Sequence, residues 1–188
     1  LRASPGWLGC GYSYQALAKA ALKASYQKLW VFEDDAILPT QEAEALTQIE
    51  TFLDGYADCD VFCGLISRFE EPPKILDVVE HDGITFVILD QMMSMVANCY
   101  SVQALQQLAQ WDGQVVDCDT NTIDVHLNHH VRRVVTTLPS FFHHESSLAS
   151  TLWGIDNDHY EPIIDTAKER LQKAVTRFLA QHTDPERL

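Results

Sequence analysis

Residues 29–35 read Leu-Trp-Val-Phe-Glu-Asp-Asp, an apolar and aromatic run followed at once by three carboxylates. Such a run predicts a buried β-strand at Leu29–Phe32. If the backbone stays extended beyond it, period-two alternation sends Glu33 and Asp35 to one face and Asp34 to the other. Two carboxylates on one face repel each other unless a cation lies between them. Such oxygen ligands suit Mg²⁺ or Mn²⁺ holding a diphosphate, whereas the plainer alternative is a solvated acidic turn before the next helix.

The rest of the chain alternates segments of helical and strand-like periodicity. Helices are expected at 12–26, after Pro39-Thr40, after Ser101, within 117–131 and at 160–181, and strands at 61–66, 75–79, 84–89, 95–100 and 134–138. This alternation predicts an α/β fold with a mixed, mostly parallel sheet flanked by helices. We expect a single domain over residues 1–188, on which the amphipathic helix 160–181 docks. Ligands bind such sheets beyond the carboxyl ends of strands, where Glu33–Asp35 lie.

The composition excludes several classes of protein. The 188 residues contain 13 Lys plus Arg and 27 Asp plus Glu, a formal net charge of −14. Nucleic-acid binding needs a basic surface, so no nucleic-acid partner is expected. No apolar run approaches the roughly 20 residues of a membrane-spanning helix. We therefore expect no transmembrane segment and a cytoplasmic protein, with a peripheral position on the inner face of the membrane as an option. The five cysteines contain no CxxC pair, which argues against a zinc knuckle or a redox dithiol.

A glycine-rich segment precedes the first helix. Residues 6–13 read Gly-Trp-Leu-Gly-Cys-Gly-Tyr-Ser. Together with residues 29–35 they resemble glycosyltransferase family 25, the lipooligosaccharide and collagen galactosyltransferase group, which reads G-x-x-G-C-x-x-S-H, a helix, an apolar strand and E-D-D. Tyr14 stands where the family has His. The family normally begins with a further strand that this sequence lacks, and the chain starts at Leu1, so we expect it to begin inside a longer gene product.

Two later segments resemble the same family. Residues 122–124, Thr-Ile-Asp, are similar to its P-I-D element. Residues 138–144, Leu-Pro-Ser-Phe-Phe-His-His, are similar to the start of its closing P-x-x-x-x-Q-x-x-x-S stretch, and are followed by Ser146, Ser147 and Ser150. The likeness therefore covers roughly residues 6–150.

The resemblance implies both a fold and a function. It implies a GT-A-like (Rossmann-type) fold, a nucleotide-sugar donor such as a UDP-sugar, and a glycan acceptor of the kind used in lipopolysaccharide biosynthesis. It implies Mn²⁺ or Mg²⁺ as cofactor, with the metal ligands drawn from Glu33, Asp35, His143 and His144. Substrate contacts are expected at Gly9, Cys10, Ser13, Asp34 and Ser147.

A second acidic group lies at Asp117, Asp119 and Asp124. A sugar transfer that inverts the anomeric centre needs a base to take the proton of the acceptor hydroxyl, and a carboxylate suits this role. Asp124 is the first candidate because it lies in the family-like element, and Asp119 is the second. Either side chain could instead cap the N-terminus of a helix.

Histidines and cations add further candidates. His143 and His144 follow a predicted strand, so that one of them could enter the same cleft as Asp35, although a packed or capping histidine is the alternative. His126 and His130 lie four residues apart on a predicted helix, but a zinc site would need a third ligand. Contacts to a diphosphate or an anionic acceptor could come from Arg68, Lys74, Arg132 and Arg133.

The sequence thus predicts a metal-dependent glycosyltransferase and leaves two alternatives open. One is a Mg²⁺-dependent phosphoryl or nucleotidyl transferase that uses the same carboxylates. The other is a non-catalytic sugar-binding relative, which the missing first strand and Tyr14 would favour.

Overall fold

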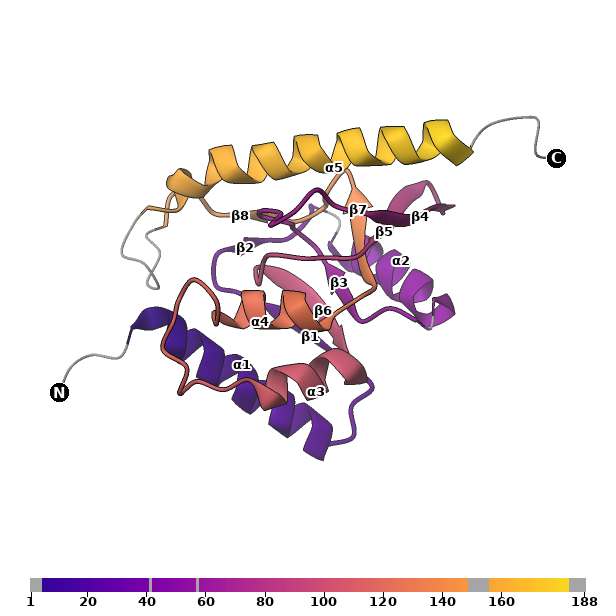
Figure 1. Cartoon of the computed structure of the whole chain (residues 1–188). Helices are drawn as coiled ribbons and strands as arrows, with labels where there is room; N and C mark the ends of the chain where they lie inside the picture. Colours follow the sequence, from indigo (N-terminus) through magenta and orange to yellow (C-terminus); the bar gives the residue numbers. More distant parts are fainter. Residues whose placement is uncertain (1–4, 41, 57, 149–155, 183–188) are drawn as a thin grey trace.

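The computed structural model describes residues 5–40, 42–56, 58–148 and 156–182 (Figure 1); Ser150 lies outside them. The helices of the described chain are α1 (Gly6–Lys23), α2 (Glu42–Gly55), α3 (Val102–Gln110), α4 (Ile123–His130), the 3₁₀ turn η1 (Asn157–Tyr160) and α5 (Glu161–His182). The strands are β1 (Lys28–Phe32), β2 (Ala36–Ile37), β3 (Val61–Cys63), β4 (Ile75–His81), β5 (Ile84–Leu89), β6 (Ala97–Ser101), β7 (Val134–Leu138) and β8 (His143–His144).

The fold is mixed α/β, with a six-stranded sheet in the order β1-β6-β3-β7-β5-β4 and a short β2–β8 pair. Among the described strands of the large sheet, β3 and β7 are parallel, while every other neighbouring pair is antiparallel. The expectation of a mostly parallel sheet is therefore wrong. The reason is that β6 inserts between β1 and β3, antiparallel to both, and that β4 and β5 form a hairpin.

Both strands of this hairpin were expected from the sequence, at 75–79 and 84–89, and they occupy 75–81 and 84–89. Its tip is the pair Asp82-Gly83, both with positive φ (49° and 78°), as a two-residue turn matched to the twist of the strands requires.

Helices cover the sheet, as predicted, and the apolar side chains form two clusters. Within β3, Val61 and Cys63 belong to one cluster and Phe62 to the other, because alternate side chains leave opposite faces of a strand. Helices α1, α3 and α4 supply the first cluster, and α2 supplies the second. Helix α5 contributes Leu171 and Val175 to the first cluster and Ile164 to the second; it runs along the side of the molecule opposite α1 and α3 (Figure 1).

The first helix differs from the sequence prediction in where it begins. Helix α1 begins at Gly6, so the glycine-rich segment is helical and is not a loop before a helix. Packing explains why a glycine occupies position 11 of this helix. A Cβ at Gly11 would lie 2.3 Å from the ring of Trp111, which is buried beyond the end of α3. The absence of a side chain therefore allows α1 to approach this ring closely.

The other elements follow the predicted order. The strand predicted at 61–66 ends at Cys63, the one predicted at 95–100 occupies 97–101, and β7 covers 134–138 as expected. Ser101 caps α3 by accepting a hydrogen bond from the backbone N–H of Ala104. Among the described helices, none is long and apolar enough to cross a membrane.

Candidate functional site

A cleft of about 380 Å³ opens where β1 ends. It lies between α1, the start of α4 and the segment η1–α5. Four carboxylates line it together with two cysteines, one histidine and one arginine: Glu33, Asp35, Asp119, Asp124, Cys10, Cys118, His144 and Arg68. Of these, Glu33, Asp35, Asp119, Asp124, Cys10 and His144 are site residues that the sequence predicted, so the cleft gathers residues from positions more than a hundred apart.

The acidic segment after β1 is a turn. The backbone N–H of Glu33 donates to the carbonyl of Val96 (2.9 Å), and that of Ala36 donates to the carbonyl of Glu33 (3.1 Å). The backbone therefore does not stay extended here. Glu33 and Asp35 nevertheless line the cleft, while Asp34 is exposed and lies outside it. In this turn, as in an extended strand, the first and third carboxylates lie on the same side of the backbone, here the side of the cleft.

Glu33 is held by the first helix. Its Oε1 accepts a hydrogen bond from the hydroxyl of Tyr14 (3.3 Å), which also contacts the carbonyl of Met95 (3.0 Å). The Sγ of Cys10 lies 3.9 Å from the same Oε1. Burial, with the charge of Asp35 second, raises the pKa of Glu33 to about 7, while the bond from Tyr14 opposes the rise. This carboxyl therefore gains or loses its proton near neutral pH.

The thiol of Cys10, beside Glu33, is not reactive at neutral pH. Burial, and then the charge of Glu33, raises the pKa of Cys10 to about 12. The thiol is therefore neutral at physiological pH and is not a nucleophile, because the thiolate is the reactive form.

Asp35 is fixed through contacts distant in sequence. Its Oδ2 accepts a hydrogen bond from Nδ2 of Asn157 (2.9 Å), and its carbonyl accepts from the backbone N–H of Glu145 (2.7 Å). Its Oδ1 is buried and has no hydrogen-bond partner among the described residues. A buried oxygen in this state costs free energy unless something binds it.

His144 is in the same condition. Its backbone pairs with Ala36 in the β2–β8 ladder, and its Nε2 is buried without a partner in the described chain. His143, one residue earlier, does not line the cleft; it lines a second pocket beside it. The assignment of His143 to the metal shell stays a prediction: His143 and His144 both line the second pocket, and of these two only His144 also lines the cleft.

Only two of the three residues of the second acidic group line the cleft. Asp124 lies in the first turn of α4 and Asp119 on the exposed loop before it, and both line the cleft, whereas Asp117 does not. Thr122 occupies the N-cap position of α4, so Asp124 is not the cap. The Oγ1 of Thr122 is also buried without a partner in the described structure, and this residue lines the cleft as well.

Four expected substrate contacts lie outside the cleft: Gly9, Ser13, Asp34 and Ser147. Trp7 and Cys10 line it, and Tyr14 reaches Glu33 from the same side of α1. Gly9 and Ser13 lie on the exposed side of that helix, where the Ser13 hydroxyl donates to the carbonyl of Gly9. The cleft lining does not include them, and their assignment as substrate contacts stays a prediction.

Ser147 is exposed, and its backbone N–H donates to the carboxylate of Glu145. It therefore serves the local turn after β8 and does not reach the cleft.

Of the candidate cations, Arg68 alone reaches the cleft in the described structure. Its guanidinium is exposed and forms no ion pair with the described residues. Arg132 donates to the carbonyls of His129 and Val131, and Arg133 donates to the hydroxyl of Tyr56.

Sequence reasoning did not find Asn157. Nothing in its neighbourhood marks it as functional, and only the folded chain brings it to Asp35. The rings of His126 and His130 lie 4.4 Å apart between centroids, tilted by 34°, and both contact backbone carbonyls. Within the described ranges, no group of three or more His, Cys, Asp or Glu is arranged to hold a metal ion by itself.

Comparison with models of known protein families and with curated protein sequences gives no match to this chain.

Proposed function

We propose that this chain is a divalent-cation-dependent glycosyltransferase with a GT-A-like fold, which moves a sugar from a nucleotide-sugar donor such as a UDP-sugar to a hydroxyl of a glycan. The observation that carries the proposal is the state of two buried atoms in one cleft. Asp35 Oδ1 and His144 Nε2 are both buried without a hydrogen-bond partner among the described residues. Buried polar atoms are normally satisfied, so exceptions on two residues that line one cleft point to a bound group.

The donor set fits a divalent cation. Carboxylate oxygens suit Mg²⁺ and Mn²⁺, and an imidazole nitrogen that joins them shifts the preference towards Mn²⁺. Glu33 and Asp35 would hold the cation, and His144 lines the same cleft. Such cations are commonly held by one or two carboxylates together with phosphate oxygens of the substrate, so a complete ligand cage of side chains is not required.

The charge of the cleft supports cation dependence. Four carboxylates line it, against the single guanidinium of Arg68 among the described lining residues. A diphosphate would be repelled from such a surface unless a cation were bound there. Arg68 has no ion-pair partner in the described chain, which leaves its guanidinium available to a phosphate oxygen.

The chain's own residues would then divide the work. A bound divalent cation supplies positive charge that stabilises the leaving diphosphate. Asn157 holds the carboxylate of Asp35 in place, and Tyr14 does the same for Glu33. Asp124, in the first turn of α4, takes the proton of the acceptor hydroxyl as this attacks, with Asp119 as the second candidate.

A turnover assay tests the proposal. The protein is incubated with Mn²⁺, a panel of UDP-sugars and a panel of glycans, and products are identified by mass spectrometry. We expect glycan products heavier by one sugar, loss of turnover with excess chelator, and loss of turnover in Asp35→Asn. Asp34→Asn, the same change on the exposed neighbouring carboxylate, is the matched control and keeps activity.

Three results would contradict the proposal. They are transfer of a phosphoryl or nucleotidyl group, turnover that persists in chelator, and the absence of any nucleotide-sugar binding with or without Mn²⁺.

A further inference from the structure

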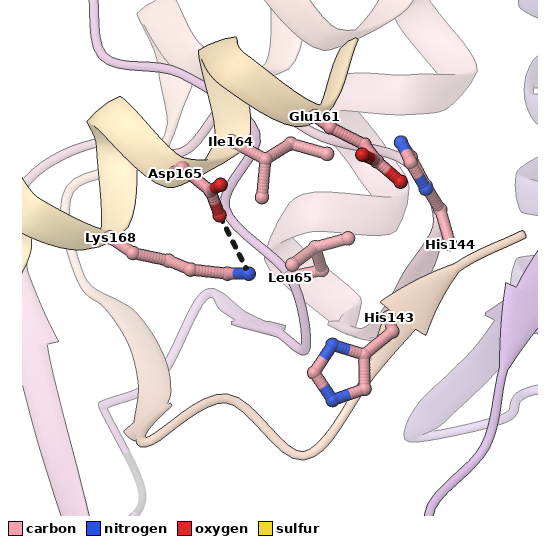
Figure 2. A pocket seen from close by; sticks show the side chains of 7 residues that line it. All are labelled: Leu65, His143, His144, Glu161, Ile164, Asp165 and Lys168. Carbon is pink, nitrogen blue, oxygen red and sulfur yellow. Dashed lines mark hydrogen bonds and ion pairs between the residues drawn. The ribbon is translucent and has the colours of Figure 1, made fainter. Parts of the chain in front are cut away.

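A second pocket of about 280 Å³ lies directly beside the cleft (Figure 2). The start of α5 forms one wall and β8 another. Its lining consists of Leu65, His143, His144, Glu161, Ile164, Asp165 and Lys168. None of the functional roles above uses this pocket.

The pocket and the cleft have a common wall. His144 and Ile164 line both of them. The side chains of η1 and the first turns of α5 lie on two sides of this wall: Tyr160 of η1 and Ile163 of α5 line the cleft, whereas Glu161, Asp165 and Lys168 of α5 line the pocket. A ligand in the pocket is therefore separated from a ligand in the cleft only by this shared wall.

Several polar groups in the pocket have unused hydrogen-bonding capacity. The carboxylate of Glu161 and the ring of His143 form no hydrogen bond or ion pair with described side chains, and His144 Nε2 is buried without a partner. Figure 2 shows the carboxylate of Glu161 beside the ring of His144. At the rim, Lys168 and Asp165 form an ion pair of 3.3 Å.

The charged, polar and apolar side chains that line the pocket favour one class of ligand. Two carboxylates disfavour an anion, and the ammonium of Lys168 disfavours a cation. A neutral ligand with many hydroxyls can donate to the carboxylates and accept from the ammonium and an imidazole N–H. Leu65 and Ile164 provide an apolar surface for the C–H face of such a ring.

We infer that this pocket binds one neutral sugar residue of the acceptor glycan, while the next residue of that glycan reaches the cleft past His144. The juxtaposition of two cavities at a common histidine is what a two-substrate transfer to a sugar chain requires. The acceptor role rests on the proposed function, whereas the sugar site itself rests on the pocket.

Binding of neutral disaccharides to the full chain tests the inference. Lactose, maltose and cellobiose serve as probes, and affinity is measured by saturation-transfer NMR and by titration. We expect at least one probe to bind, and to bind about tenfold more weakly to Glu161→Gln and to Lys168→Gln, since each change removes a hydrogen bond to a charged group. Glu161 also lies at the start of α5, so Lys168→Gln provides a variant that leaves the helix N-terminus unchanged.

Matched controls lie further along the same helix. Glu169 and Lys173 form an exposed ion pair of 3.1 Å and do not line the pocket, so Glu169→Gln and Lys173→Gln should bind as the wild type does. Binding of UDP with Mn²⁺ should be unchanged in all four variants.

The outcomes are separable. If no probe binds, or if Glu161→Gln and Lys168→Gln bind the probes as the wild type does, the inference is overturned. If sugar binding depends on these residues but UDP with Mn²⁺ does not bind the wild type, the sugar site stands and the transferase proposal fails.

Discussion

The side-chain amide of Asn157 donates a hydrogen bond of 2.9 Å to Oδ2 of Asp35, across 122 positions of sequence. The same Nδ2 also donates to the carbonyl of Glu145 (3.1 Å), which ties the segment after β8 to the turn after β1. Asp35 is thereby held with one oxygen satisfied and the other buried and unpaired in the described structure. This arrangement holds Oδ1 of Asp35 in a fixed position, where it could serve as a ligand to a cation.

Asn157→Ala should therefore weaken both folding and cation binding. It leaves two partly buried acceptors without this donor, so we expect the free energy of unfolding in urea to fall by about 1–3 kcal/mol. Mn²⁺ affinity should fall about 10–100-fold, as is usual when a group that orients a metal ligand is removed. Asn121→Ala is the control, because Asn121 also donates two side-chain bonds to carbonyls but lies outside the cleft. Equal Mn²⁺ affinities in the two variants would contradict the role of Asn157.

The carboxyl of Glu33 should make stability depend on pH in a defined direction. Its pKa in the folded protein is raised to about 7 from an ordinary value of 4.5. Between these values the folded state binds more protons than the unfolded state, so the free energy of unfolding falls as pH rises from about 5 to about 7 and then levels off. In metal-free buffer, Glu33→Gln should lose this slope, while Glu44→Gln, a change on the exposed side of α2, should retain it. A wild-type curve that rises over this interval because of Glu33 would refute the assignment.

Tyr14→Phe should change the pKa of Glu33 without leaving a cavity in the core. The change removes one hydroxyl that contacts Glu33 and the carbonyl of Met95, and keeps the buried ring. We expect a loss of about 1 kcal/mol in stability and a further rise in the pKa of Glu33, because the bond from Tyr14 favours the ionised form. The midpoint of the pH dependence of unfolding should move upward. An unmoved midpoint would show that the hydroxyl does not govern this carboxyl.

The two helical glycines Gly9 and Gly11 provide a paired test of the fold. A Cβ at Gly11 would lie 2.3–2.7 Å from three ring atoms of Trp111, whereas a Cβ at Gly9 meets nothing within 4 Å. Gly11→Ala should destabilise the protein by about 1–3 kcal/mol through overpacking. Gly9→Ala should stabilise it by about 0.5–1 kcal/mol, because alanine is the better helix former. Thermal unfolding of both variants, measured side by side, checks the packing of α1; the opposite order would contradict it.

The sequence was informative wherever local chemistry decides the structure. An apolar strand before three carboxylates, positive φ at Asp82-Gly83 and a capping Ser101 each follow from neighbouring residues. The order of the strands in the sheet does not follow from neighbouring residues, because the hydrophobic periodicity of a strand carries no information on which strand lies beside it. The insertion of β6 between β1 and β3 is decided only by the folded core.

The candidate site shows the same division. Glu33, Asp35 and Asp124 could be found because carboxylates at a strand end or a helix start have a recognisable pattern. Asn157 could not be found, because its contact with Asp35 exists only after η1 has packed against the turn that follows β1. Gly9 and Ser13, expected as substrate contacts from the resemblance, lie on the exposed side of α1 and outside the cleft; the sequence did not indicate this, because the glycine-rich segment was expected to precede the first helix.

Binding of Mn²⁺ tests the central claim most directly. The free Mn²⁺ signal in electron paramagnetic resonance is followed as wild-type protein, Asp35→Asn or Asp34→Asn is added, with and without UDP. We predict that the wild type and Asp34→Asn bind a single Mn²⁺ more tightly when UDP is present, and that Asp35→Asn binds it at least about tenfold more weakly. Equal Mn²⁺ binding by Asp35→Asn and wild type, or no effect of UDP on either, would contradict a cation site at the end of β1.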